Sequence, residues 1–212
     1  MFAPTFIHRF EPGTKTEAIP LLLLHGTGGD ENDLLLLGRA VAPEAALLSP
    51  RGQVLEHGAP RFFRRLSEGV FDEDDVRRRA DELASFIEAA RTHYHIASPM
   101  ALGYSNGANI AAAMLLLHQR VLSGAILLRA MVPLTTVVPV DLAGKPVLIL
   151  SGAQDPIVPV ENAARLSDLL RAANALVEHH TLPVGHGLSN EDVAVVRRWL
   201  QDAVKATRSP TP

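Results

Sequence analysis

Three polar residues, far apart in the chain, could supply a nucleophile, a base and an orienting acid. Ser105 follows the apolar run MALGY, Asp155 follows VLILSGAQ, and His186 lies in VGHGL. A serine hydroxyl becomes nucleophilic when a base takes its proton, and an acid then fixes the tautomer of that base. These residue types, in this order along the chain, predict acyl transfer through a covalent intermediate.

Ser105 is the centre of a G-x-S-x-G pattern that runs from Gly103 to Gly107. Such a turn reverses the chain sharply from strand to helix and strains the backbone of the serine. A side chain two positions before or after the serine would collide with the neighbouring strand or helix. The alternative is a chance match with an ordinary turn serine, but the two later partners favour a nucleophile.

The base and the acid must be chosen among several candidates. His186, one of nine histidines, lies late in the chain in a short loop after a predicted strand, and Asp155 stands at another strand end. Asp141 and Asp168 are weaker candidates for the acid. The alternative interpretation makes His186 a surface histidine and Asp155 a turn residue.

Two backbone N–H groups are candidates to bind the oxyanion of the tetrahedral intermediate. One belongs to Asn106, directly after the nucleophile, and the other to Thr27 in the loop LLLLHGTGGDE. This loop is rich in glycine, but it lacks the lysine of a P-loop, and G-x-G-x-x-G is absent. We predict no metal site, because the chain has no cysteine and no H-E-x-x-H pattern. Serine chemistry of this kind requires no cofactor.

The elements that must position these groups follow from hydrophobic patterning. Dense apolar runs predict buried strands at 19–26, 45–50, 98–105, 123–130, 145–155 and 176–183. Amphipathic patterns predict helices at 33–41, from Asp72 through Ala90, and at 106–118, 161–173 and 190–205. The alternation favours a mostly parallel sheet, whose ligands bind at the carboxyl ends of the strands. We expect one domain over 1–212, with a flexible tail at 206–212.

The composition is that of a globular protein, with 47% hydrophobic and 20% charged residues and a net charge of −3. We therefore expect no nucleic-acid partner, and the apolar runs are too short for membrane insertion. No signal peptide is visible, and the absence of cysteine fits a reducing compartment, so a cytoplasmic location is expected. Whether the chain forms a homodimer stays open.

Several blocks of the chain resemble the phospholipase/carboxylesterase family, which includes acyl-protein thioesterases. They are LLLLHGTGGDENDLLLLGRAV, SPRGQVLEHGAPRFFRRL, GYSNGANIAAAML, SGAQDPIVP and GHGLS. Within the family, the G-x-P-R-F-F and LLRAMVP segments are most similar to small bacterial carboxylesterases associated with quinone or copper stress. The resemblance implies an α/β-hydrolase fold: a mostly parallel central sheet with helices on both faces and no large lid domain. It implies the same triad and the same two backbone donors.

The resemblance also implies that residues 59–65 run along the rim of the site. Phe62 or Phe63 would then shape an apolar pocket, unless both belong to the core. Arg61 and Arg129 are candidates to steer an anionic substrate group, or else are structural. The chain departs from the family in having Asn106 where many members have Gln.

The predicted function is a serine hydrolase that cleaves small soluble carboxylic esters. A thioesterase acting on acyl-protein or acyl-CoA is the alternative within the class. A non-catalytic small-molecule sensor or interaction module on the same scaffold is the alternative from another class. The physiological substrate and its acyl length stay open.

Overall fold

The computed structural model describes residues 6–136 and 139–208, without the side chains of 203–208. The strands of these residues are β1 (His8–Glu11), β2 (Leu21–Leu24), β3 (Leu47–Pro50), β4 (Val54–Glu56), β5 (Ala59–Arg61), β6 (Arg65–Ser67), β7 (Val70–Phe71), β8 (Met100–Tyr104), β9 (Gly124–Leu128), β10 (Pro146–Gly152) and β11 (Leu176–Leu182). The helices are α1 (Leu35–Val41), α2 (Glu73–Tyr94), α3 (Asn106–Leu117), α4 (Val160–Ala172) and α5 (Asn190–Arg208).

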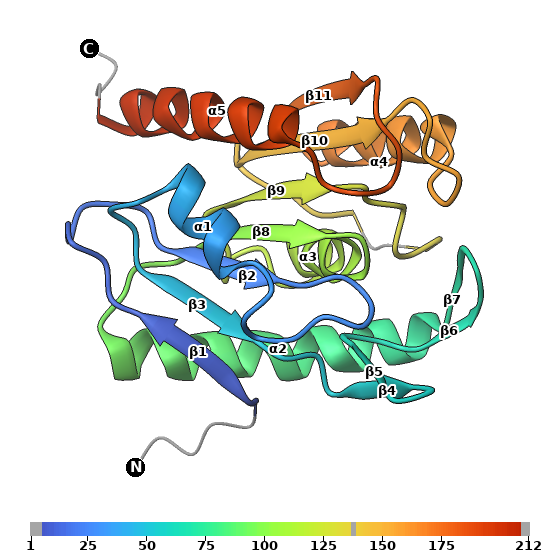
Figure 1. Ribbon diagram of the computed structural model, residues 1–212, viewed down its shortest axis with the longest axis horizontal. Coiled ribbons are helices and arrows are strands. Elements are labelled where there is room, and N and C mark those ends of the chain that lie inside the picture. Colours follow the sequence, from blue (N-terminus) through green and yellow to red (C-terminus); the bar gives the residue numbers. More distant parts are fainter. Residues whose placement is uncertain (1–5, 137–138, 209–212) are drawn as a thin grey trace.

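Seven strands form one twisted sheet in the order β1-β3-β2-β8-β9-β10-β11. The edge strand β1 is antiparallel to β3, and the remaining neighbours are parallel. The arrowheads of β8 to β11 consequently point the same way, to the right in Figure 1. The loops after these strands meet at one edge of the sheet, as the predicted α/β-hydrolase fold requires.

Both faces of the sheet are covered by helices (Figure 1). α2, α3 and α4 pack on one face, and α1 and α5 pack on the other. The leucines of β2 face both layers in turn. Leu22 and Leu24 pack in the hydrophobic core beneath α2, α3 and α4, whereas Leu21 and Leu23 pack in the core beneath α1 and α5. A strand buried on both sides needs an unbroken apolar run, which is why β2 shows no polar alternation.

The predicted helices and the six predicted sheet strands are present, with bounds shifted by a few residues. The expectation that residues 176–183 form a buried strand is wrong, because β11 is an edge strand in which Leu182 alone is buried. Asp72 caps α2 as expected, because its side chain accepts the N–H of Asp75. α5 extends to Arg208 and so includes the start of the expected tail, whereas 209–212 lie outside the described residues. No helix among the described residues is both long enough and apolar enough to cross a bilayer.

Five short strands were not predicted from the sequence. β1 adds the antiparallel edge, and two hairpins, β4–β5 and β6–β7, lie between β3 and α2. The hairpins lie on the right in Figure 1, beside the carboxyl ends of the sheet strands. They form a small rim at the edge where the predicted site residues are found.

Candidate active site

The loops after β8, β10 and β11 bring Ser105, Asp155 and His186 together. Nδ1 of His186 lies 2.8 Å from Oδ2 of Asp155, and Nε2 lies 3.0 Å from Oγ of Ser105. A carboxylate can only accept, so Nδ1 carries the proton and Nε2 accepts the hydroxyl proton of Ser105. This is the tautomer that a general base acting on serine needs.

Asp155 is held so that one oxygen remains for the histidine. Its side chain is fully buried, and Oδ1 accepts the N–H groups of Ile157 and Val158 at 2.8 and 3.0 Å. Oδ2 is thereby fixed toward His186. The geometry is that of a carboxylate whose task is to orient an imidazole.

Ser105 has a strained backbone, with φ 52° and ψ −115°, at the turn from β8 into α3. Its N–H donates to the carbonyl of Leu128 on β9 at 2.8 Å, which fixes the turn against the neighbouring strand. A non-glycine residue with positive φ is uncommon, and such strain persists only where surrounding contacts impose it.

The two glycines of the turn are required by close backbone contacts. A Cβ at Gly103 would lie 2.5 Å from the carbonyl oxygen of Gly107. A Cβ at Gly107 would clash with the Leu24 carbonyl of β2. Both obstacles are main chain atoms, which no rotamer change can move away.

We therefore expect Gly107→Ala to destabilise the fold by about 3 kcal/mol or more, as severe overpacking does. Thermal unfolding followed by circular dichroism measures the loss. Gly187→Ala is the matched control, because a Cβ there meets nothing within 4 Å. The control should change stability by less than about 0.5 kcal/mol. Equal melting temperatures of the Gly107 variant and the wild type would contradict the steric argument.

The N–H groups of Thr27 and Asn106 are free to bind an oxyanion. Neither donates to a backbone or side-chain acceptor among the residues that the structure describes. Asn106 is the first residue of α3, so the positive end of the helix dipole adds to its N–H. Their role as donors stays a prediction.

His25, which sequence reasoning did not single out, fixes the loop that carries Thr27. Its Nδ1 donates to the Gly26 carbonyl at 2.7 Å, and its Nε2 accepts the N–H of Gly52 at 2.9 Å. Burial lowers the pKa of His25, which favours the neutral ring that this pair of bonds requires. The histidine at the end of β2 therefore joins two loops of the site.

Asn106, which stands where many members of the family have Gln, also has a structural role through its side chain. Its Oδ1 accepts the N–H of Phe62 at 2.7 Å, which ties the segment after β5 to the turn at Ser105. Its buried Nδ2 has no hydrogen-bond partner among the described residues. The shorter amide thus still connects the turn to the rim.

A narrow cleft of about 30 Å³ opens beside Ser105. The other lining residues are Thr27, Arg61, Arg65, Glu68, Phe71, Asn106, Asn109, Arg129, Met131, Ile157 and Val158. Phe62 and Phe63, expected to shape this pocket, are instead buried in the core with α2 and α3. The bond from Asn106 to the Phe62 backbone turns this segment inward, so the aromatic wall comes from Phe71.

The two arginines expected to contact substrate are already paired. Arg61 lines the cleft, but it is 3% exposed, forms an ion pair with Glu56 and donates to Oγ1 of Thr27 at 2.8 Å. Its contact with an anionic substrate stays a prediction. Arg129 is fully buried against Asp192, which corrects the expectation that it steers substrate. All of its N–H groups are used within the protein.

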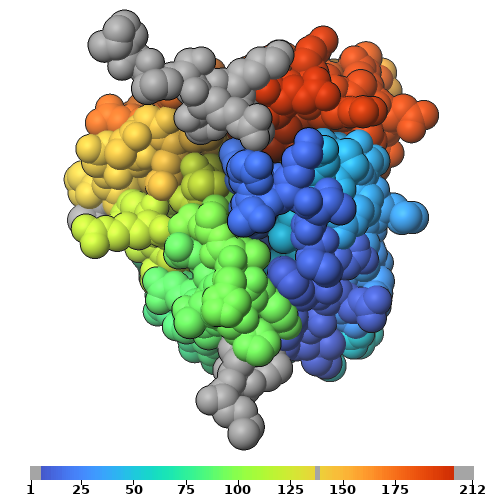
Figure 2. All heavy atoms as spheres, turned by 90° about the vertical axis from the view of Figure 1, so that its left-hand side faces the viewer, coloured from blue at the N-terminus to red at the C-terminus, as the bar shows by residue number. Residues whose placement is uncertain are grey.

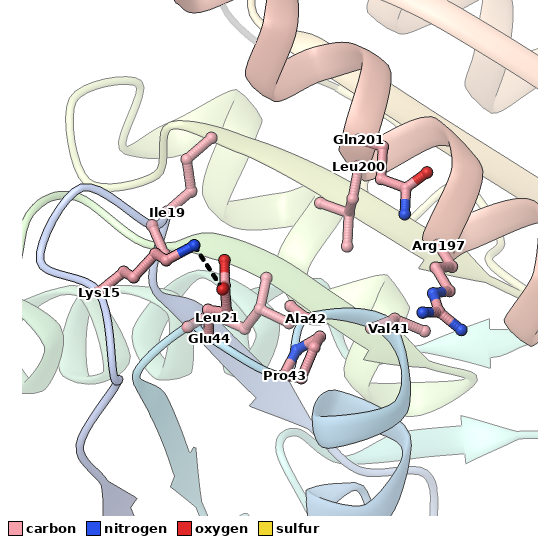
Figure 3. Close-up of a pocket in the computed structure, with 12 residues that line it drawn as sticks. Lys15, Ile19, Leu21, Val41, Ala42, Pro43, Glu44, Arg197, Leu200 and Gln201 are labelled. Carbon is pink, nitrogen blue, oxygen red and sulfur yellow. Dashed lines mark ion pairs between the residues drawn. The ribbon is translucent and has the colours of Figure 1, made fainter.

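A second, larger pocket of about 380 Å³ lies at the amino ends of the strands (Figure 3). It is bounded by α5, by the segment after α1 and by the loop that contains Lys15, whose ammonium pairs with Glu44 at 2.5 Å. Figure 2 shows this side of the molecule, where the blue amino-terminal segment lies beside the red α5. The lining contains no serine, cysteine or histidine.

Comparisons with known proteins identify a family and several relatives of this chain. Residues 8–204 match the model of the Phospholipase/Carboxylesterase family. The chain is 48% identical over 199 residues to the protein MhqD of Bacillus subtilis, covering 93% of this chain and 98% of that one. It is similar to the crystal structure of a Bacillus cereus carboxylesterase, with a TM-score of 0.92, 45% identity, and coverage of 94% of this chain and 95% of that chain. A Mesorhizobium loti carboxylesterase matches with a TM-score of 0.85, 34% identity, and coverage of 89% and 90%.

Proposed function

The chain belongs to the phospholipase/carboxylesterase family, whose members are carboxylesterase-type hydrolases, and from this premise we propose a serine hydrolase that cleaves small carboxylic esters. The observation that carries the proposal is the chain of hydrogen bonds from Ser105 through His186 to Asp155. The three residues come from different loops, and Ser105, the residue that would attack the ester, lines the cleft.

In the first half of the reaction, Oγ of Ser105 attacks the ester carbonyl while Nε2 of His186 takes the hydroxyl proton. The carbonyl oxygen becomes an oxyanion that accepts the N–H groups of Thr27 and Asn106. The tetrahedral intermediate collapses, the C–O bond to the alcohol breaks, and His186 returns the proton to the leaving oxygen. The acyl group is then an ester of Ser105.

In the second half, water replaces the alcohol. His186 removes a proton from that water, whose oxygen attacks the acyl carbonyl, and the same two N–H groups hold the new oxyanion. The bond to Ser105 breaks as Oγ regains the proton from His186. Asp155 stabilises the imidazolium in both halves without taking the proton. The products are a carboxylic acid and an alcohol.

The lining of the cleft supports a small acyl group. Phe71, Met131, Ile157 and Val158 supply apolar contacts, and the space between them is narrow. An acyl chain longer than the cleft would have to remain in water or displace these side chains. Either outcome makes binding of the longer ester less favourable.

We expect kcat/KM for nitrophenyl esters to be highest for acetate or butanoate and to fall about tenfold or more at octanoate, because a full site cannot take further methylenes. Met131→Ala, which shortens a lining side chain, should shift this preference toward longer chains. A wild type that prefers octanoate would contradict the size argument and leave the hydrolase proposal intact.

Labelling with a fluorophosphonate, which reacts with activated serines, tests the hydrolase proposal itself. The proposal predicts a covalent adduct on Ser105 and turnover of nitrophenyl acetate. A protein that neither labels nor hydrolyses any ester or thioester would refute it and favour a non-catalytic role. A protein that labels but turns over only thioesters, such as acyl-CoA, would change the substrate class alone.

A further inference from the structure

Arg129 stands at the carboxyl end of β9, between the strands that precede Ser105 and Asp155. Its Nε donates to the carbonyl of Gly185 at 3.0 Å, and its Nη2 donates to the carbonyl of Gly187 at 3.2 Å. These are the residues on either side of His186. One guanidinium therefore holds the loop before and after the histidine.

Asp192, at the start of α5, fixes the other side of the guanidinium. Its two oxygens accept from Nη1 and Nη2 of Arg129 at 2.8 Å each, and the side chains of both residues are at most 1% exposed. Nη1 also donates to the Leu150 carbonyl of β10 at 3.2 Å. A guanidinium has five N–H groups, and these five bonds use all of them.

The two glycines that flank His186 have few close neighbours around their Cα atoms. A Cβ at Gly187 would meet nothing within 4 Å, and one at Gly185 would meet only the Gln154 carbonyl, at 3.6 Å. The carbonyl between them, that of His186, accepts the hydroxyl of Tyr104 at 3.2 Å. Burial raises the pKa of Tyr104, so its hydroxyl keeps the proton it donates. Three consecutive carbonyls are thus bonded to side chains of β8 and of the residue after β9.

We propose that the buried Arg129–Asp192 pair is a positioning device for the general base, which fixes the backbone of residues 185–187 so that Nε2 of His186 faces Ser105. The inference rests on the proposed hydrolase function. It differs from substrate steering, because Arg129 has no N–H group left to donate. Because Asp192 balances the charge, the guanidinium supplies directional donors without a net positive charge that would oppose the imidazolium.

The decisive variant replaces both charges at once, as Arg129→Met together with Asp192→Asn. Removing both partners avoids an unpaired buried charge, so we expect the double variant to fold. Asn keeps an acceptor for the N–H of Ser189, which Asp192 binds at 2.8 Å. We expect kcat for nitrophenyl acetate to fall about 100-fold, because a displacement of a catalytic group by about 1 Å can cost that much. KM should stay within about threefold of the wild-type value. A pair with a purely structural role would lower the melting temperature and leave kcat unchanged.

The matched control removes an ion pair far from the cleft. Arg39 of α1 donates to Glu11 of β1 at 2.8 Å and to the carbonyl of Ala45 at 2.9 Å. Arg39→Met with Glu11→Gln should leave kcat within about twofold of the wild type, since neither residue approaches the triad. The inference is overturned if the folded Arg129/Asp192 variant keeps wild-type kcat, or if the control loses as much.

A conservative variant decides the question should the double variant not fold. Lys at position 129 keeps the charge beside Asp192, but its three donors share one nitrogen and cannot reach both loop carbonyls and the carboxylate. Arg129→Lys should lower kcat about tenfold with little change in KM. Unchanged kcat would overturn the inference. Lack of hydrolysis by the wild type itself would instead refute the proposed function.

Discussion

We expect Ser105→Ala to lower kcat/KM for nitrophenyl acetate by roughly 10⁴- to 10⁶-fold, as removal of a triad nucleophile does. The alanine keeps the turn and removes only Oγ, the atom 3.0 Å from Nε2 of His186. Residual turnover would come from water bound near the two free N–H groups. Stopped-flow or long-time spectrophotometric assays with the purified variant measure the difference, and fluorophosphonate labelling should disappear.

A second serine–histidine pair provides an unusually close control. Ser151 of β10 has Oγ 2.9 Å from Nε2 of His179, but Ser151 is 1% exposed and also lies 3.1 Å from Oγ1 of Thr181. Ser151 lines neither the cleft beside Ser105 nor the pocket at the amino ends of the strands, and no acid in the described part of the chain is hydrogen-bonded to His179, so this pair should not react. Ser151→Ala should therefore label and hydrolyse like the wild type. Labelling that survives in the Ser105 variant and disappears in the Ser151 variant would reverse the assignment.

The second large effect is expected for Asp155→Asn, which should lower kcat by roughly 10⁴-fold, the loss seen when a triad aspartate is replaced by asparagine. The amide still accepts the N–H groups of Ile157 and Val158 through Oδ1. In place of Oδ2 it offers an N–H group to Nδ1 of His186, which selects the other tautomer. Nε2 then carries a proton and cannot take the one from Ser105.

Asp141→Asn tests whether the loss follows from the histidine contact or from the turn. Asp141 is exposed, and its Oδ1 accepts the N–H of Ala143 two residues on, in the same local arrangement as Asp155 with Ile157. No histidine contacts it in the described structure. We expect kcat within about twofold of the wild type, the effect usual for a surface substitution. A similar loss in both variants would count against the orienting role of Asp155.

The core of the site could be predicted because it depends on a simple rule of parallel sheets. Each apolar run ends at the same edge, so a reactive residue directly after a run must lie near the others. Ser105, Asp155 and His186 satisfy this rule, and the structure brings them within hydrogen-bond distance. Their catalytic roles remain the prediction that the experiments above test.

The hairpins and the edge strand escaped prediction because strands of two to four residues are too short to show a periodicity. Residues 54–71 alternate charged and apolar types without a regular repeat, and their pairing depends on contacts with the completed sheet. The same tertiary contacts bury Phe62 and Phe63. A single apolar residue beside a site can face inward or outward, and its type does not decide between them.

The pairing of Arg129 with Asp192 joins residues 63 positions apart, which no local pattern indicates. A signal was nevertheless present in the S-x-x-D sequence from Ser189 to Asp192, a capping-box pattern that spans the start of α5. The structure bears this out, because Asp192 accepts the N–H and hydroxyl of Ser189 at 2.8 Å. Such a pattern predicts the start of the helix, but neither the burial of Asp192 nor its pairing with Arg129.

The bond between Ser105 and His186 spans 81 residues of chain, and Tyr104 reaches the same loop across 82. Contacts between residues this far apart in the sequence form late in folding, because they cost the conformational entropy of the long loop between them. β11 and α5 must dock before His186 faces Ser105. Recovery of hydrolysis during refolding should therefore report the final step of assembly, while circular dichroism reports the earlier formation of helices and sheet.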